Sequence, residues 1–470
     1  MSTSTYSGAP WPHFDEDQIE AAASVLRSGR VNYWTGTEGR EFETEFGRIT
    51  GLAHAIFVAN GTAALELALR ALNLSPGADV VTTPRTFIAS SGAIVAAGLQ
   101  PVFADVDRDS GNITRETIER ALTEKTEAVL VVHLGGWPAE MKEIRALCDT
   151  RGLALIEDCA QAHGAKIDGA HVGTFGDVAA WSFCQDKIIS TGGEGGMVAT
   201  NDGAIWQRMW SYKDHGKSYA AVYATDSPPG FRWLHESFGT NWRGTEVQAA
   251  IGRIQYRNLP EWHRQRTTNA LTLAGRLSGV PGLRVPLPSR HDTHAFYRLY
   301  AYVDSELLRP GWNRDRIIGE LETRHRIPAF SGSCSEIYRE QAFIRKGLAP
   351  AYPLPVAELM TQESLAFLVH PGLTETDMNV VADSVALVMA EAVGSDYECA
   401  EEFSVRDPQM QGAPRGAMQD SDMHARSLIT GRNDEIWRPV KLGNTVDSPA
   451  LSPSGLSQDQ SSRSAEGPDQ

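Results

Sequence analysis

A single lysine between two apolar runs is the first residue whose surroundings suggest chemistry. Lys187 follows the apolar run Val178–Phe183, and a glycine-rich turn comes after it at Gly192, Gly193, Gly195 and Gly196. Glycine lets a chain turn tightly and approach a ligand closely. A lysine in a partly dry site with cationic neighbours loses its proton more readily and can form an imine with an aldehyde. An isolated lysine is also commonly a solvated side chain, so this segment leaves both interpretations open.

An acidic pair lies 29 residues before that lysine. Glu157-Asp158 ends an apolar run that starts at Leu153. A carboxylate at that point emerges at the carboxyl edge of a parallel sheet, where it can keep a pyridinium nitrogen protonated, so that a cofactor ring acts as an electron sink. The alternative is that the pair caps the next helix.

A third segment, Asn60-Gly61-Thr62-Ala63-Ala64-Leu65, follows an apolar run and opens a helical pattern. Free N–H groups at a helix start, together with a threonine hydroxyl, suit a phosphate group. Thr62 is equally suited to cap the helix. The chain contains neither GxxxxGK[ST] nor GxGxxG, and Lys187 precedes its glycines, so a P-loop and a dinucleotide-binding loop are disfavoured.

The elements around these segments predict an α/β fold. Short apolar runs alternate with helical stretches, which is typical of βαβ units and a mostly parallel sheet. The runs are Ala55–Ala59, Asp79–Thr83, Gln100–Ala104, Ala128–His133, Leu153–Glu157 and Val178–Phe183. The helical stretches include Thr62–Leu72, Ser90–Ala97 and Ala139–Arg151. We therefore predict a large domain over residues 11–241, with a mostly parallel central sheet flanked by helices and a ligand site at the carboxyl ends of its strands.

The pattern changes at about Trp242 and predicts a smaller C-terminal α/β domain over residues 242–394. Its expected elements are helices over Thr245–Leu259, Trp262–Ser278, Asn313–Arg324 and Glu375–Val393, and a strand over Ala295–Val303. Residues 395–470 are rich in Ser, Asp, Gln, Gly and Pro, so we expect a disordered tail. A short docking segment around Ile436–Leu442 is an alternative for part of it.

Composition and charge narrow the function classes. The 470 residues are 41% hydrophobic and carry a net charge of −16, so a nucleic-acid partner is disfavoured. We find neither a membrane span nor a secretory signal. The five cysteines are widely spaced, with no CxxC pair, which favours a reducing cytoplasm over disulfides or a metal site.

Six motifs occur in the following order along the chain: NGTAAL, TFIAS, FADVD, IEDCAQAHGA, SFCQDK…GGEGGMV and GTNWR.TE.QAAIGR. Because the motifs occur in the family's order, the chain resembles the DegT/DnrJ/EryC1/StrS family of sugar aminotransferases over residues 12–385. The resemblance implies the fold type I aminotransferase architecture, the cofactor pyridoxal 5′-phosphate (PLP), and a homodimer with its active sites at the subunit interface.

The resemblance also implies a role for each matching residue. Lys187 matches the lysine that forms a Schiff base with PLP, and Asp158 matches the acid that pairs with the pyridine nitrogen. The other matching residues are expected to contact the cofactor. Gln161 matches a residue near its ring hydroxyl, and Phe87 matches the residue that stacks on its ring. Ser182 and the helix start at Gly61, Thr62 and Ala63 match residues that bind its phosphate, and Asn241 matches an asparagine that reaches this phosphate from the neighbouring subunit. His163 follows the family pattern without a clear role.

The implied reaction moves an amino group from L-glutamate to a nucleotide-linked keto sugar, an NDP-4-keto-6-deoxyhexose, and releases 2-oxoglutarate. Alternatives are a keto-cyclitol acceptor, a fold type I lyase or desulfurase, and a non-catalytic PLP-binding regulatory protein. Some relatives carry histidine in place of the lysine and are dehydratases, which Lys187 argues against.

Two positions depart from the family pattern: Gly244, where methionine is common, and Arg85, which either contacts substrate or caps a strand. Several other side chains are candidates for a sugar-nucleotide groove, although each is as readily packing or surface: Tyr33, Trp34, Arg232, Trp233, His235 and Arg243. His215–Tyr219 is a candidate mobile loop over the site.

Overall fold

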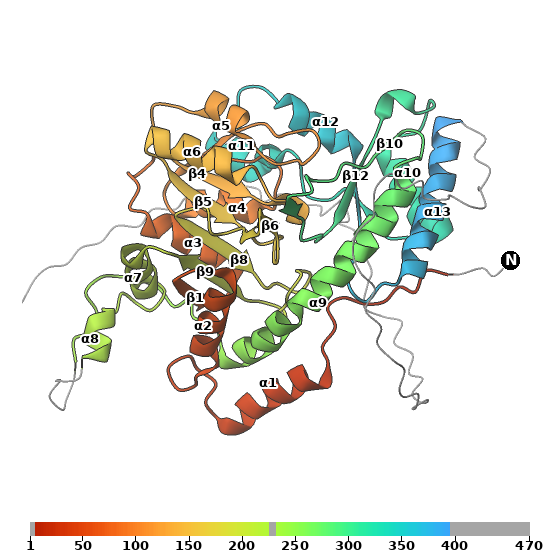
Figure 1. Cartoon of the computed structure of the whole chain (residues 1–470). Coiled ribbons are helices and arrows are strands. Elements are labelled where there is room, and N and C mark those ends of the chain that lie inside the picture. The colour runs from red at the N-terminus through yellow and green to blue at the C-terminus, as the bar shows by residue number, and fades with distance from the viewer. Residues whose placement is uncertain (1–4, 225–231, 395–470) are drawn as a thin grey trace, which may run out of the picture. The chain divides into compact units, whose positions relative to one another are not determined.

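A computed structural model describes residues 5–224 and 232–394, which lie in one compact unit formed by Met1–Glu401 (Figure 1). The predicted tail, residues 395–470, and the possible docking segment Ile436–Leu442 are outside the described residues. Within the described residues, no helix is long and apolar enough to cross a membrane.

A seven-stranded sheet forms the centre of this unit, in the order β1-β9-β8-β5-β4-β2-β3. All neighbouring pairs are parallel except those that involve β9, which runs antiparallel to both β8 and β1. The strands are β1 (His54–Val58), β2 (Asp79–Thr82), β3 (Gln100–Phe103), β4 (Thr126–Val132), β5 (Ala154–Asp158), β8 (Val178–Ser182) and β9 (Gly196–Thr200). The predicted mostly parallel sheet is therefore confirmed, and each predicted strand lies within two residues of an observed one.

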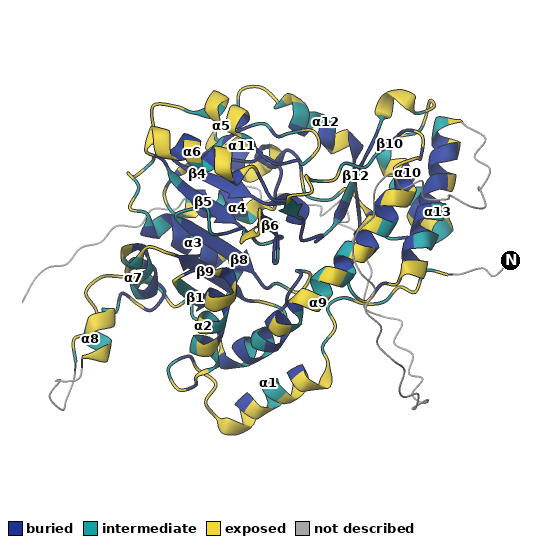
Figure 2. Ribbon diagram, in the orientation of Figure 1, coloured by how far each residue is buried: buried dark blue, intermediate teal, exposed yellow. Residues whose placement is uncertain are grey.

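Both faces of this sheet are buried, as Figure 2 shows by the dark blue of its strands. Along β4, Val129 and Val131 pack into one apolar core, whereas Ala128 and Leu130 pack into a second core on the opposite face. Continuous apolar strands of this kind require helices on both sides. The helices of this part are α1 (Glu16–Ser28), α2 (Glu38–Thr50), α3 (Gly61–Ala71), α4 (Ile88–Ala96), α5 (Arg115–Ala121), η1 (Leu134–Gly136), α6 (Met141–Arg151), α7 (Gly203–Tyr212) and α8 (Tyr219–Tyr223).

One long helix, α9 (Glu246–Leu277), replaces the two helices expected over Thr245–Leu259 and Trp262–Ser278. The expected break falls at Pro260, where the missing N–H and the ring usually interrupt a helix. Here the helix continues, because α9 packs against α1 and α2 over its first half and against α13 (Glu375–Val393) over its second half. Burial on both sides of the proline outweighs its local cost.

The second sheet has four antiparallel strands in the order β10-β12-β14-β13. They are β10 (Leu283–Arg284), β12 (Leu299–Val303), β13 (Ala329–Phe330) and β14 (Ser364–Phe367). Its core also contains α10 (Arg314–His325) and α13, which lie at their predicted positions and are capped by Asn313 and Thr374. The division into domains at residues 241 and 242 stays a prediction.

The remaining elements connect these parts. A three-stranded sheet is formed by β11 (Asp292–Thr293), β6 (Lys166–Ile167) and β7 (Ala170–His171). The strand expected over Ala295–Val303 is shorter at its start, since Phe296 adopts a φ of 48°, outside the extended region. The last helices are η2 (Ser305–Leu307), η3 (Ile337–Arg339), α11 (Gln341–Lys346) and α12 (Pro355–Glu363).

Candidate active site

A cavity of about 990 Å³ lies at the carboxyl edge of the central sheet. Residues from both sheets and the loops around them line it. Those predicted from the sequence are Gly61, Thr62, Ala63, Phe87, Asp158, Gln161, Ser182 and Lys187. Eight of the nine residues expected at the cofactor therefore share one cavity, because β1, β2, β5 and β8 run in the same direction and end at the same edge.

Asp158 is the last residue of β5 and is 4% exposed. One carboxylate oxygen accepts a hydrogen bond from the Ser90 hydroxyl at 2.8 Å, and the other accepts from the Ala160 N–H at 3.0 Å. Burial raises the pKa of Asp158 above its ordinary value, and these two hydrogen bonds oppose the shift only in part. No helix follows β5, so the alternative that this acid pair caps a helix is wrong.

Lys187 lies in the loop between β8 and β9, and its side chain reaches the cavity. Its Nζ lies 5.1 Å from the centroid of the Tyr297 ring, and the Tyr297 hydroxyl donates a hydrogen bond to Asp186. The Lys187 carbonyl accepts from Trp11 Nε1 at 2.8 Å. Trp11 thus fixes the backbone of Lys187, and Tyr297 fixes its ammonium group.

The start of α3 and the end of β8 meet at one end of the cavity. Asn60, and not Thr62, caps α3: its side chain accepts from the Ala63 N–H at 2.8 Å. A Cβ on Gly61 would lie 2.6 Å from the Cβ of Ser182, so only glycine lets the helix start approach this strand. The positive end of the helix dipole and the Thr62 and Ser182 hydroxyls then face the same space, an arrangement that suits a phosphate group.

Phe87 and Gln161 line the cavity between these two ends. Phe87, the residue before α4, is 67% exposed, which is unusual for a phenylalanine and leaves its ring free to contact a ligand. The Gln161 carbonyl oxygen accepts from the Gly135 N–H at 2.7 Å, which fixes the amide and leaves its NH₂ group for another acceptor. His163 is buried beside Phe183 and bonds the Ser182 carbonyl; it does not line the cavity.

Asn241 is the expected cofactor residue that the structure does not bring into this cavity. It is exposed, and a β-bridge joins it to Asp214. Of the loop His215–Tyr219, none lines the cavity either, and Lys217, Ser218 and Tyr219 line a separate cleft. The candidate groove residues Tyr33, Trp34, Arg232, Trp233, His235 and Arg243 are likewise absent from its lining.

The two departures from the family pattern have different explanations. Gly244 packs so closely on the Phe57 ring that no Cβ would fit there. Arg85 is fully buried and donates to the Ser364 hydroxyl, with the Tyr300 ring 5.0 Å from its guanidinium carbon. Arg85 therefore supports the cavity wall from behind and does not line it.

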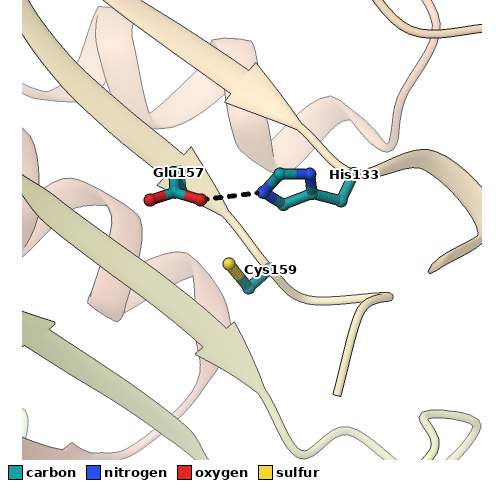
Figure 3. Close-up of side chains that lie close together, drawn as sticks. All are labelled: His133, Glu157 and Cys159. Atoms are coloured by element: carbon teal, nitrogen blue, oxygen red, sulfur yellow. Dashed lines mark hydrogen bonds and ion pairs between the residues drawn. The ribbon is translucent and has the colours of Figure 1, made fainter. Parts of the chain in front are cut away.

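Beside Asp158, a buried cluster of three side chains lies behind the site: His133, Glu157 and Cys159 point toward one another in Figure 3. Glu157 accepts from His133 Nε2 and from the three N–H groups of Gly173, Phe175 and Gly176, at 2.6–3.0 Å. His133 Nδ1 accepts from the Ala139 N–H. Because these hydrogen bonds occupy the carboxylate oxygens and both ring nitrogens, the cluster joins the ends of β4 and β5 to their loops rather than offering ligands to a metal ion.

Part of the cavity wall was not identified from the sequence. Residues that come from beyond position 290 are Tyr297, Arg298, Tyr300, Phe330, Gly332, Ser333, Cys334, Ile337, Glu340 and Ala366. Ser90 and Trp11, which bond Asp158 and Lys187, were also missed. The aromatic run around Tyr297 was visible, but only the folded chain brings it to Lys187.

A mostly parallel sheet, a lysine at its carboxyl edge and a buried carboxylate beneath it together define a fold type I aminotransferase. Comparison with known proteins gives the family: the model of the DegT/DnrJ/EryC1/StrS aminotransferase family matches residues 12–386, and the chain belongs to that family. The chain is similar to the structure of the aminotransferase from Psychrobacter cryohalolentis, with 52% identity, a TM-score of 0.80, and coverage of 82% of this chain and 99% of that one.

Two relatives of known activity differ in sugar and nucleotide. The chain is 32% identical to dTDP-4-dehydro-2,3,6-trideoxy-D-glucose 4-aminotransferase of Saccharopolyspora spinosa, over 79% of this chain and 94% of that protein. It is 33% identical to UDP-N-acetyl-3-dehydro-α-D-glucosamine 3-aminotransferase of Acidithiobacillus ferrooxidans, over 75% and 89% respectively.

The cofactor of this family is PLP, and the cavity fits it. The buried carboxylate of Asp158 accepts two hydrogen bonds but forms no ion pair with a basic side chain of the described residues, and a protonated ring nitrogen would supply that cation. The helix start and Ser182 suit the phosphate, and the exposed face of Phe87 suits an aromatic ring. The acid, the lysine and the phosphate donors are thus arranged around a single space.

Proposed function

We propose that this enzyme transfers the amino group of L-glutamate to a nucleotide-linked keto sugar, an NDP-4-keto-6-deoxyhexose, and releases 2-oxoglutarate. The observation that carries the proposal is one cavity of about 990 Å³ that holds both Lys187 and Asp158 and is large enough to admit a sugar beside a cofactor. The relative that acts at C4 of a dTDP-linked sugar supports the position, although another relative acts at C3 of a UDP-linked sugar.

The residues that would hold PLP follow from their positions. Asp158 would pair with the ring nitrogen, Phe87 would stack on the ring, and Gln161 would donate its amide N–H to the ring hydroxyl. At the other end of the cavity, Ser182 and the helix start at Gly61, Thr62 and Ala63 would bind the phosphate. When bound, PLP supplies an electron sink for the carbon that loses its proton.

Lys187 performs the proton transfers. The Nζ amine of Lys187 would accept the proton from Cα of glutamate as a general base. In the second half-reaction the same nitrogen returns a proton to the sugar carbon that receives the amino group. Tyr297 lies against Nζ and is itself fixed by Asp186, so the amine keeps its position while its partner changes.

A homodimer with shared sites forms the second part of the proposal. Asn241 is exposed and outside the cavity of its own chain, as expected for a residue that serves the neighbouring subunit. A cytoplasmic location is supported by the four cysteines of the described residues, Cys148, Cys159, Cys184 and Cys334, all of which are free.

A half-reaction screen tests the reaction. The holoenzyme is loaded with L-glutamate, the cofactor absorption is followed, and purified NDP-keto sugars and keto-cyclitols are then added separately. We expect glutamate to yield one 2-oxoglutarate per active site, and one class of nucleotide-linked keto sugar to reverse the spectral change. Lys187→Ala should retain less than about a thousandth of the activity, since the general base contributes 10²–10⁴-fold and the covalent link is also lost. Wild-type rates in Lys187→Ala, or a cyclitol as the only acceptor, would refute the proposal.

Mixed dimers test the shared site. Lys187→Ala and Asn241→Ala variants are each weakly active if both residues are required. If Asn241 serves the partner's site, mixing the two variants restores one intact site per heterodimer and part of the activity. Absence of restoration in a mixture from which differently tagged heterodimers are isolated would contradict a role of Asn241 in the partner's site.

A further inference from the structure

Two arginines beside the active site lack a carboxylate partner. Among residues 5–224 and 232–394, no carboxylate oxygen lies within 4.0 Å of the guanidinium of Arg298 or Arg266. Arg266 is 1% exposed, and burial, followed by repulsion from Arg298, lowers its pKa to about 9. Arg266 is buried and Arg298 is half-buried, and the two cations repel each other without a counter-ion among the described residues. An anionic ligand bound at Arg298 would relieve that repulsion.

Arg298 is the member of this pair that lines the cavity. Its guanidinium carbon lies 4.8 Å from the centroid of the Tyr297 ring and 5.7 Å from that of Phe330. Lys187 Nζ lies 5.1 Å from the same Tyr297 ring. Arg298 and Lys187 thus contact the same aromatic side chain at the wall of the cavity.

The acids that line the cavity do not neutralise Arg298. Asp158 is engaged with Ser90 and Ala160, and Asp186 accepts from the Tyr297 hydroxyl. Glu66 pairs with Arg70 at 2.7 Å. The two other acids of the lining, Glu194 and Glu340, form no ion pair with Arg298 within residues 5–224 and 232–394. The aromatic rings position the guanidinium without supplying a negative charge, and its planar donors remain available for a bidentate acceptor.

We propose that Arg298 binds the carboxylate of the amino donor. This inference rests on the proposed function, because it assigns a residue to the donor half of that reaction. A carboxylate accepts two parallel hydrogen bonds from one guanidinium, which fixes both the position and the orientation of the amino acid. When the keto sugar replaces the donor, its hydroxyl and ring oxygens accept hydrogen bonds from the same group.

The position of Arg298 favours the donor over the phosphates of the nucleotide. In an amino acid the α-carboxylate is bonded directly to the carbon that Lys187 deprotonates. In a nucleotide-linked sugar the diphosphate is attached at C1, with the sugar ring between it and the reacting carbon. A cation that shares an aromatic ring with Lys187 is therefore placed for the nearer anion.

The test compares Arg298→Gln with Arg316→Gln in the holoenzyme. Arg316 is a matched control because its guanidinium also lies over an aromatic ring, that of Trp312 at 4.1 Å, on the surface and outside the cavity. Both variants are first checked for melting temperature and cofactor content. Isothermal titration with glutarate, a dicarboxylate without an amino group, gives a readout that does not depend on turnover.

For Arg298→Gln we expect glutarate affinity and the second-order rate constant of the glutamate half-reaction each to fall roughly 10- to 100-fold, the usual cost of a lost hydrogen bond to a charged group. The half-reaction with the amino sugar product should fall less than about fivefold. Arg298→Lys should recover only part of the loss, because an ammonium lacks the planar fork. Arg316→Gln should match the wild type throughout.

Two results would overturn the inference: an unchanged glutamate half-reaction, or a larger loss for the amino sugar than for glutamate, which would assign Arg298 to the diphosphate. Failure of the proposed function is separate and is seen in the wild type, which would then not react with glutamate at all. Glutarate binding by the wild type and its loss in Arg298→Gln would still support a carboxylate site in that case.

Discussion

Replacing Asp158 by asparagine gives a strong test of how the site works, because the substitution removes a charge and keeps the shape. The Ala160 N–H can still donate to the amide oxygen, and the Ser90 hydroxyl can rotate to accept from the new NH₂ group. The buried acid already carries a raised pKa, so its charge costs free energy in the protein without cofactor. We therefore expect the free energy of unfolding of the apoprotein to change by less than about 1 kcal/mol.

Catalysis should respond very differently. Removing one partner of a buried ion pair costs about 3–5 kcal/mol. If Asp158 pairs with the ring nitrogen, that cost corresponds to a fall of roughly 10²- to 10⁴-fold in the rate of the glutamate half-reaction, at about 1.4 kcal/mol per factor of ten. The loss should be in the rate constant rather than in the affinity for glutamate, since the ring nitrogen is remote from the donor's carboxylates.

Rapid mixing of holoenzyme with glutamate, followed by cofactor absorption, measures this rate. Glu340→Gln is the control, because Glu340 also lines the cavity but has an ordinary exposed environment; we expect less than a threefold change, within about 0.6 kcal/mol. Ser90→Ala, which removes one hydrogen bond to the acid, should give an intermediate loss of about tenfold. An Asp158→Asn protein that keeps its cofactor and reacts within threefold of the wild type would refute the assignment.

Three further predictions concern stability and cofactor affinity. Burial raises the pKa of Glu43 to about 7, above the ordinary value of 4.5, so the carboxyl group ionises at lower pH in the unfolded chain than in the folded one. The free energy of unfolding of the wild type should therefore fall by up to about 3 kcal/mol as the pH rises from 4.5 to 7. Denaturant titrations of Glu43→Gln should not show this fall, and the same dependence of unfolding free energy on pH in both proteins would contradict the prediction. Gly61→Ala should weaken PLP binding at least tenfold through its clash with Ser182, in equilibrium dialysis, whereas Gly92→Ala, with open space at its Cβ, should not. Glu157→Gln should lower the free energy of unfolding by about 2–4 kcal/mol, because the new amide NH₂ group would face backbone N–H donors. Thermal or chemical unfolding measures this change, and a loss below about 0.5 kcal/mol would contradict the prediction.

Much of the central sheet could be predicted from the sequence, because its strands are buried on both faces. Each reads as a short apolar run, and the runs lie within two residues of the observed strands. Helices with a polar cap were also predictable: Asn313 and Thr374 mark the starts of α10 and α13. Short apolar runs and capping residues therefore suffice to predict an element when the folded structure buries that run and uses that cap.

Local signals failed where packing competed with them. Two helices were predicted over Thr245–Leu259 and Trp262–Ser278, but neighbours on both sides of Pro260 keep α9 continuous. Thr62 was considered as the helix cap, but α3 begins at Gly61, and the side chain of Asn60 caps it instead. Arg85 was a candidate for substrate contact, yet the folded chain buries it behind Tyr300.

The sequence by itself determined the family, because the family is recognised by motifs in a fixed order along the chain, and the same motifs predicted Lys187 and Asp158 as the lysine and the acid of the site. Only the tertiary structure decided which distant residues complete the site. Lys187 and Arg298 are 111 positions apart and carry no mutual signal in the sequence, but the fold brings both onto the Tyr297 ring. Contacts of this kind follow from how two sheets pack, and no local pattern encodes that packing. The lysine before the glycine-rich turn is thereby one of two cations that contact the same aromatic ring in a single cavity.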